Sequence, residues 1–169
     1  MKVLSWTKDT AYLSAFGRQI EVSNVVRNEL NGRRKLGLKS DAVLTEPDDG
    51  TKPMPYMPRG FPEGSWKITG IVPHTDPKDH YLNPYFIATN AHALVEVWGL
   101  DALGGYDKPT GSFVRDSGYG IHWPDPAYSM TTLGCIRIVS KQDLLWLVSQ
   151  IQTATAAGEE IIFAVSSAR

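Results

Sequence analysis

Alternating apolar and polar residues, the pattern of a strand with one buried face, recur along most of this 169-residue chain. Turn-forming residues separate the alternating segments, as expected for a chain of short strands. We interpret residues 10–26 as a hairpin with its turn at 15–18. Further strands are predicted at residues 64–72, 85–89, 93–98 and 161–165, a strand beginning at 113 is predicted to lead to His122, and residues 109–112 are predicted to be a turn.

A single segment near the C-terminus has clear helical spacing. Apolar residues recur at helical intervals from Leu144 to Ile151, Ser140 and Asp143 resemble a helix N-terminal cap, and Gly158 supplies a stop. Many strands and one helix predict a mainly β fold of the α+β class, an antiparallel β-sandwich or barrel with one packed helix near the C-terminus. The length fits a single domain spanning residues 1–169.

Composition excludes several classes of function. A net charge of -1 and a pI near 6.4 argue against a nucleic-acid partner, because phosphate binding requires clustered positive charge. No apolar run approaches the ~20 residues that span a bilayer, so we expect no transmembrane segment. The N-terminus lacks the apolar stretch of a signal peptide, which leaves the export route open. The sequence does not indicate whether the chain is a monomer or an oligomer.

The segment around the single cysteine is the candidate reactive site. Gly134 precedes Cys135 and an apolar Ile-Arg-Ile follows it, so Cys135 is predicted to sit where a turn enters a strand. Backbone N–H groups surround a side chain in such a position, which suits a thiolate nucleophile. His122, thirteen positions earlier at the predicted end of a strand, could serve as its base. Taken alone, a lone cysteine is more often a small buried apolar residue.

Two blocks of this segment resemble the signature of the YkuD-like family, the L,D-transpeptidase catalytic domains. They are Tyr119-Gly120-Ile121-His122-Trp123 and Thr132-Leu133-Gly134-Cys135-Ile136-Arg137, and the resemblance is strongest over residues 55–165. The chain departs from the pattern at Trp123, where the family has glycine, at Thr132, where it has serine, and in a shorter spacing between His122 and Cys135. These departures imply a reshaped substrate groove.

The resemblance implies a role for each residue of the signature. Cys135 would be the nucleophile and His122 its base, with the ring of His122 oriented by a backbone carbonyl such as that of Trp123. Backbone N–H groups, including those of Leu133 and Gly134, would stabilise the oxyanion. Substrate contacts would come from Arg137, Thr132 and Tyr119; Arg137 could equally lock the cysteine loop by binding backbone carbonyls.

The implied activity is cysteine-dependent acyl transfer on peptidoglycan stem peptides, through a thioester and with release of D-Ala, in the cell envelope or periplasm. Two alternatives stay open. One is an L,D-carboxypeptidase or wall-degrading hydrolase, of the effector or phage type, with the same fold. The other is a non-catalytic cell-wall-binding domain. No cofactor is implied, and no metal site is expected, because the spacings of His74, His80 and His92 match no strong metal motif.

Overall fold

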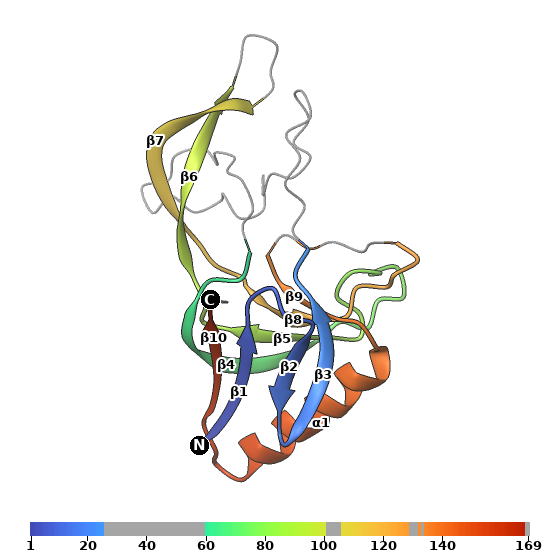
Figure 1. The fold of residues 1–169 in the computed structure, drawn as a ribbon. Helices are drawn as coiled ribbons and strands as arrows, with labels where there is room; N and C mark the ends of the chain where they lie inside the picture. The colour runs from blue at the N-terminus through green and yellow to red at the C-terminus, as the bar shows by residue number, and fades with distance from the viewer. Residues whose placement is uncertain (26–59, 101–105, 129–131, 133, 168–169) are drawn as a thin grey trace.

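The protein is a closed β-barrel with one helix packed against it (Figure 1). The computed structural model describes residues 1–25, 60–100, 106–128, 132 and 134–167. Around the barrel the strands follow the order β1-β10-β4-β5-β8-β9-β3-β2. Their bounds are β1 Lys2–Thr7, β2 Tyr12–Ala15, β3 Arg18–Ser23, β4 Gly64–Pro73, β5 Tyr85–Thr89, β8 Gly120–His122, β9 Ile136–Ile138 and β10 Ile161–Ser166.

Most strands form where the alternation predicts them, because alternation records one face turned to the barrel interior. The predicted hairpin is confirmed as β2 and β3, which pair antiparallel across a turn where Phe16 and Gly17 both have positive φ. The predicted strands that became β4, β5 and β10 are also confirmed. Strand β1 was not predicted; it buries Leu4 and Trp6 and completes the barrel beside β10.

The predicted antiparallel arrangement is wrong in part, because the barrel is mixed. Strands β1 and β10 run parallel, and so do β8 and β9. Parallel neighbours need a long crossover connection, and residues 123–135 between β8 and β9 provide one. The barrel, not an open sandwich, is therefore the observed form of the predicted mainly β fold.

A two-stranded ribbon, β6 (Ala93–Leu100) and β7 (Tyr106–Asp116), extends away from the barrel (Figure 1). The predicted turn at residues 109–112 is wrong, since these residues lie within β7. Within the described residues each strand of this ribbon pairs only with the other, so each has an unpaired edge. Proline is tolerated on such an edge, and the register shifts near Trp98, which pairs with Pro109, are typical of bulged ribbons.

The helix is the predicted one, α1 (Lys141–Ala156). The Ser140 hydroxyl accepts a hydrogen bond from the Asp143 N–H, and Gly158, with φ of 81°, follows its C-terminus, as the capping pattern predicts. Its apolar face packs against β5, β9 and β10. The residues on that face are Leu144, Leu147, Val148, Ile151 and Ala154.

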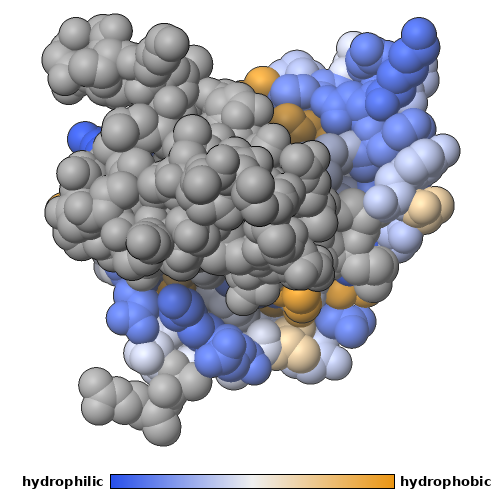
Figure 2. Space-filling view, turned by 90° about the horizontal axis from the view of Figure 1, so that it is seen from above, coloured by the Kyte–Doolittle hydropathy of each residue, from blue (hydrophilic) through white to orange (hydrophobic). Residues whose placement is uncertain are grey.

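One face of the molecule can be judged from the space-filling view. Seen from above, the described residues on the visible face are mostly hydrophilic, with hydrophobic residues in small separate groups (Figure 2). Within the described part of the chain, no helix has the length and apolar character needed to cross a membrane.

Candidate active site

Strands β8 and β9 place the candidate catalytic residues on one face of a parallel pair. Their register aligns Ile121 with Ile136 and His122 with Arg137. Both isoleucines are fully buried in the barrel core. Because side chains alternate along a strand, His122 and Arg137 project together from the opposite face. Cys135 comes two residues before Arg137, so the same alternation directs it toward that face.

Cys135 is half-buried immediately before β9. Its Sγ lies 3.7 Å from the carbonyl oxygen of Gly118, in the segment that leads into β8. Cys135 is thus beside the start of β8, whereas His122 is at its end. Two residues of strand separate these points, about 7 Å along the backbone. The structure therefore places the predicted nucleophile and base on neighbouring strands, and the register sets Arg137, not Cys135, opposite His122.

A network of hydrogen bonds holds the backbone around Cys135. The Asn24 side-chain amide donates to the carbonyl oxygens of both Gly134 and Cys135, each over 2.9 Å. Its Oδ1 atom accepts from the Phe61 N–H over 3.1 Å. Asn24 follows β3 and was missed by sequence reasoning, because nothing local to it points to a loop more than 100 residues away.

Thr132 belongs to the same network. Its hydroxyl donates to the Cys135 carbonyl over 2.7 Å and accepts from the Gly134 N–H at 3.2 Å. Only 1% of Thr132 is exposed and its hydroxyl bonds within the cysteine loop, while its predicted contact with substrate stays a prediction. The Gly134 N–H donates to this hydroxyl in the described structure, and its role as an oxyanion donor stays a prediction. Glycine suits this position because its φ is 128°, and Leu133 lies outside the described residues.

Tyr119, the third residue predicted to contact substrate, lies in the core, and the predicted contact stays untested. It is fully buried, its hydroxyl donates to the carboxylate of buried Asp116, and its ring packs 5.6 Å from that of Phe61. Its carbonyl accepts from the Thr89 hydroxyl over 2.6 Å. Tyr119 therefore belongs to the core that supports β8.

His122 is fully buried, and its ring is held from the loop that precedes β5. Nδ1 lies 2.9 Å from the carbonyl oxygen of Tyr81, so this carbonyl, and not that of Trp123 as predicted, orients the ring. The Tyr81 and Phe86 rings pack against the imidazole at 4.9 and 5.8 Å between centroids. A carbonyl can only accept, so the proton of the neutral ring is on Nδ1. Nε2 then carries a lone pair, and it is buried without a hydrogen-bond partner among the described residues.

Burial lowers the pKa of His122 to about 4. The hydrogen bond to Tyr81 and the negative charge of Asp79 oppose this shift, while the positive charges of Arg137 and His74 reinforce it. Imidazole in water has a pKa of about 6.5, so burial keeps His122 neutral at pH 7. A neutral ring with a free Nε2 lone pair can accept a proton.

Arg137 is a buried cation, with 3% of its surface exposed. No described carboxylate forms an ion pair with it, and its Nε atom has no hydrogen-bond partner within the described part of the chain. Burial lowers the pKa of Arg137. A desolvated guanidinium with an unused donor is suited to bind a carboxylate, which would restore the interactions lost from water.

Trp123 is half-buried next to a small polar cavity of about 260 Å³. The ammonium of Lys141 lies 5.4 Å from the centre of its ring. Asp79, His80 and Asp125 also line this cavity. Within the described residues, no three His, Cys, Asp or Glu side chains are grouped as a metal site would require.

The comparisons with known proteins identify one family. The family model of the L,D-transpeptidase catalytic domain, YkuD, matches residues 46–162, which is more than half of the chain and includes both candidate catalytic residues. No curated protein and no solved structure matches the chain.

Proposed function

The chain belongs to the YkuD family of L,D-transpeptidase catalytic domains, and on that premise we propose that it transfers acyl groups of peptidoglycan stem peptides through a thioester at Cys135. The family acts on peptidoglycan, which suggests a place in the cell envelope. The observation that carries the proposal is the pairing of β8 with β9. It sets His122 beside Arg137, the residue two positions after Cys135.

In the first step the Cys135 sulfur would attack the carbonyl carbon of the third stem residue. A carbon–sulfur bond forms while the thiol proton moves to His122 Nε2. The amide C–N bond then breaks, D-Ala leaves, and the same proton passes to its nitrogen. An amine of a second stem peptide next attacks the thioester, loses a proton to His122 and regenerates the thiol.

The protonation state of His122 bears on how this step begins. Burial lowers the pKa of His122 to about 4, so its ring is neutral at pH 7. We infer that this neutral ring removes the thiol proton as the carbon–sulfur bond forms, acting as a general base.

Stabilisation of the oxyanion would come from the N–H of Cys135. This N–H shares its peptide group with the Gly134 carbonyl, and the hydrogen bond from Asn24 to that carbonyl fixes the orientation of the peptide group. In other acyl-transfer enzymes a well-placed donor of this kind contributes about 3–4 kcal/mol to the transition state.

Arg137 would bind a carboxylate of the stem peptide. Its burial beside His122, without a described ion-pair partner, favours this role over a purely structural lock on the cysteine loop. A substrate carboxylate bound there would also bring negative charge near His122, which favours the imidazolium formed during attack.

Product analysis tests the proposal. Purified disaccharide-tetrapeptide is incubated with the wild-type protein and with Cys135→Ala, and the products are identified by mass spectrometry. A cross-linked dimer made only by the wild type supports transpeptidation, whereas a tripeptide with loss of D-Ala assigns a carboxypeptidase, in which water attacks the same thioester. Absence of both products from the wild type would overturn the proposed substrate.

A further inference from the structure

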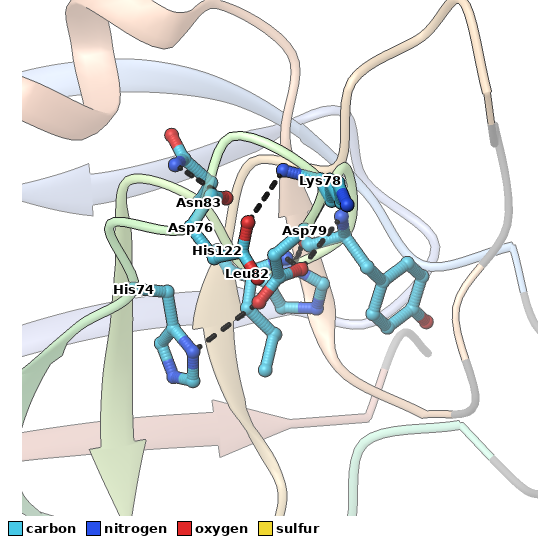
Figure 3. A network of polar contacts seen from close by, with 8 residues as sticks. His74, Asp76, Lys78, Asp79, Leu82, Asn83 and His122 are labelled. Atoms are coloured by element: carbon cyan, nitrogen blue, oxygen red, sulfur yellow. Dashed lines mark hydrogen bonds and ion pairs between the residues drawn. The ribbon is translucent and has the colours of Figure 1, made fainter.

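The loop between β4 and β5, residues 74–84, is built around the carboxylate of Asp79. One oxygen of this carboxylate accepts from the backbone N–H groups of Tyr81 and Leu82, over 3.0 and 2.8 Å. The other oxygen lies 3.3 Å from Nδ1 of His74. Figure 3 shows this network. Asp79 therefore joins the first residue of the loop to the turn at 81–82.

The turn that Asp79 holds is the one that presents the Tyr81 carbonyl to His122. Because Asp79 fixes the N–H of Tyr81 and of the next residue, it fixes the peptide plane that contains the Tyr81 carbonyl. That carbonyl is 2.9 Å from His122 Nδ1. Three segments are thus linked in series: His74 after β4, the turn at 79–82, and the end of β8.

Contacts at the base and in the middle of the loop anchor it without using the Asp79 carboxylate. The His74 N–H donates to the Pro84 carbonyl over 2.8 Å, and the Asp125 N–H donates to the His80 carbonyl over 2.9 Å. The His80 ring is stacked on that of Tyr128, 3.6 Å between centroids. The loop should consequently keep its path when the Asp79 carboxylate is removed, leaving the orientation of one peptide group as the main change.

We propose that His74 and Asp79 form a positioning pair that holds the Tyr81 carbonyl against His122 and thereby keeps the His122 proton on Nδ1. Neither residue contacts the reacting atoms. The value of this pair to catalysis rests on the proposed function, because only a His122 that accepts the thiol proton at Nε2 needs the proton fixed on Nδ1. The tautomer itself can be measured without any substrate.

The charge of Asp79 also acts on the pKa of His122. Its negative charge favours the protonated form of His122, whereas the charge of a protonated His74 disfavours it. Burial alone would raise the pKa of Asp79, but hydrogen bonds from Leu82 and Tyr81, together with His74, lower it below its ordinary value. Asp79 is therefore ionised at neutral pH and remains an acceptor for both N–H groups.

The same loop contains a matched control. The Asp76 carboxylate accepts from the Lys78 N–H over 2.9 Å, a turn of the same kind, but it does not bind the turn at 81–82. Asp76→Ala and Asp79→Ala remove the same number of side-chain atoms from the same loop. Asp79→Asn keeps an oxygen acceptor for the N–H groups of Tyr81 and Leu82 while it removes the charge.

The test is the tautomer of His122 measured by long-range proton–nitrogen NMR on ¹⁵N-labelled full-length protein at pH 7, with the rate of Cys135 alkylation by iodoacetamide measured in parallel. In the wild type, Nδ1 should be protonated and Nε2 unprotonated. In Asp79→Ala the two nitrogen shifts should move toward each other, and alkylation should slow by about 10-fold, the lower end of the loss seen when partners that orient metal-bound histidines are removed. Asp76→Ala should change neither readout.

Asp79→Asn should restore the Nδ1–H tautomer, and His74→Ala should slow alkylation less than Asp79→Ala does. An unchanged tautomer in Asp79→Ala would overturn the proposal, and equal effects of Asp76→Ala and Asp79→Ala would reduce it to general loop stability. If His74→Ala leaves the alkylation rate unchanged, His74 is not a member of the pair. If the wild type fails to process peptidoglycan while the tautomer still depends on Asp79, the proposed function fails and the positioning pair stands.

Discussion

Asn24 donates a hydrogen bond to the carbonyl oxygen of Cys135 over 2.9 Å, although 111 positions separate the two residues. The same amide group binds the preceding carbonyl, and its oxygen accepts from Phe61 in the core. One side chain thus connects β3, the barrel core and the cysteine loop. The N-terminal hairpin is therefore part of the structure that supports the candidate site.

Replacement of Asn24 tests this connection. Asn24→Ala removes three hydrogen bonds and should lower the free energy of unfolding by about 2–3 kcal/mol, measured by urea denaturation. Both changes should slow the alkylation of Cys135. Asn24→Asp keeps the acceptor for Phe61 but places a carboxylate against two carbonyl oxygens, so it should slow alkylation at least as much as Asn24→Ala does. The control is Asn90→Ala, which removes a single hydrogen bond, the one that the Asn90 side chain accepts from the Lys67 N–H. Equal alkylation rates for all three variants and the wild type would remove Asn24 from the site.

Gly120 is required by the close approach of β5 to β8. A Cβ at this position would lie 2.3 Å from the Phe86 ring and 2.4 Å from the Ile87 carbonyl oxygen. Gly120→Ala must therefore push the strands apart, at a cost of about 1–3 kcal/mol, and displace His122 two residues later. Thermal unfolding and alkylation of Cys135 should both be affected. Gly70→Ala in β4 is the control, because a Cβ there would meet no described atom within 4 Å; equal stability of the two variants would refute the clash.

Tyr119→Phe separates a core role from a substrate role. The change removes the hydroxyl that donates to buried Asp116 and should cost about 1.5–3 kcal/mol of stability, the range for hydrogen bonds to charged groups. Turnover should stay close to that of the wild type at a temperature where both proteins are folded. Unchanged stability with lost turnover would return Tyr119 to the substrate-binding residues.

The buried neutral imidazole of His122 makes stability depend on pH. Its pKa is about 4 in the folded protein and about 6.5 in the unfolded chain, so the unfolded chain binds more protons between these values. The contribution, about 3 kcal/mol, is fully present above pH 6.5 and is lost as the pH falls toward 4. Urea denaturation across this range should show a slope that His122→Asn flattens and that His92→Asn, at an exposed position, leaves in place. An equal slope in His122→Asn and the wild type would contradict the assigned pKa.

Local sequence patterns predicted the elements well where one face of a strand or helix is buried. The alternation in β4, β5 and β10 and the helical spacing after Ser140 each record a single buried face, and the capping residues mark the ends of α1. The short strand β1 escaped notice because only Leu4 and Trp6 carry its pattern. Strand direction could not be predicted, because pairing between distant strands leaves no mark in a local window.

The candidate site divides in the same way. Cys135, His122 and Arg137 were predicted because reactive side chains have identities that can be read from the sequence. The carbonyl that orients His122 belongs to Tyr81, and a backbone carbonyl has no residue type that reveals it. Asn24, His74 and Asp79 act by position, which only the folded chain defines. Thr132 and Tyr119 were predicted to contact substrate, but burial gives their hydroxyl groups partners inside the protein.

The most direct test of the central claim is detection of an acyl group on Cys135. The wild-type protein, Cys135→Ala and His122→Ala are mixed with disaccharide-tetrapeptide, quenched in acid at short times, and examined by intact mass and peptide mapping. We predict a thioester on the peptide that contains Cys135 in the wild type, a much smaller amount in His122→Ala and none in Cys135→Ala. Product formation by Cys135→Ala at the wild-type rate would contradict the account.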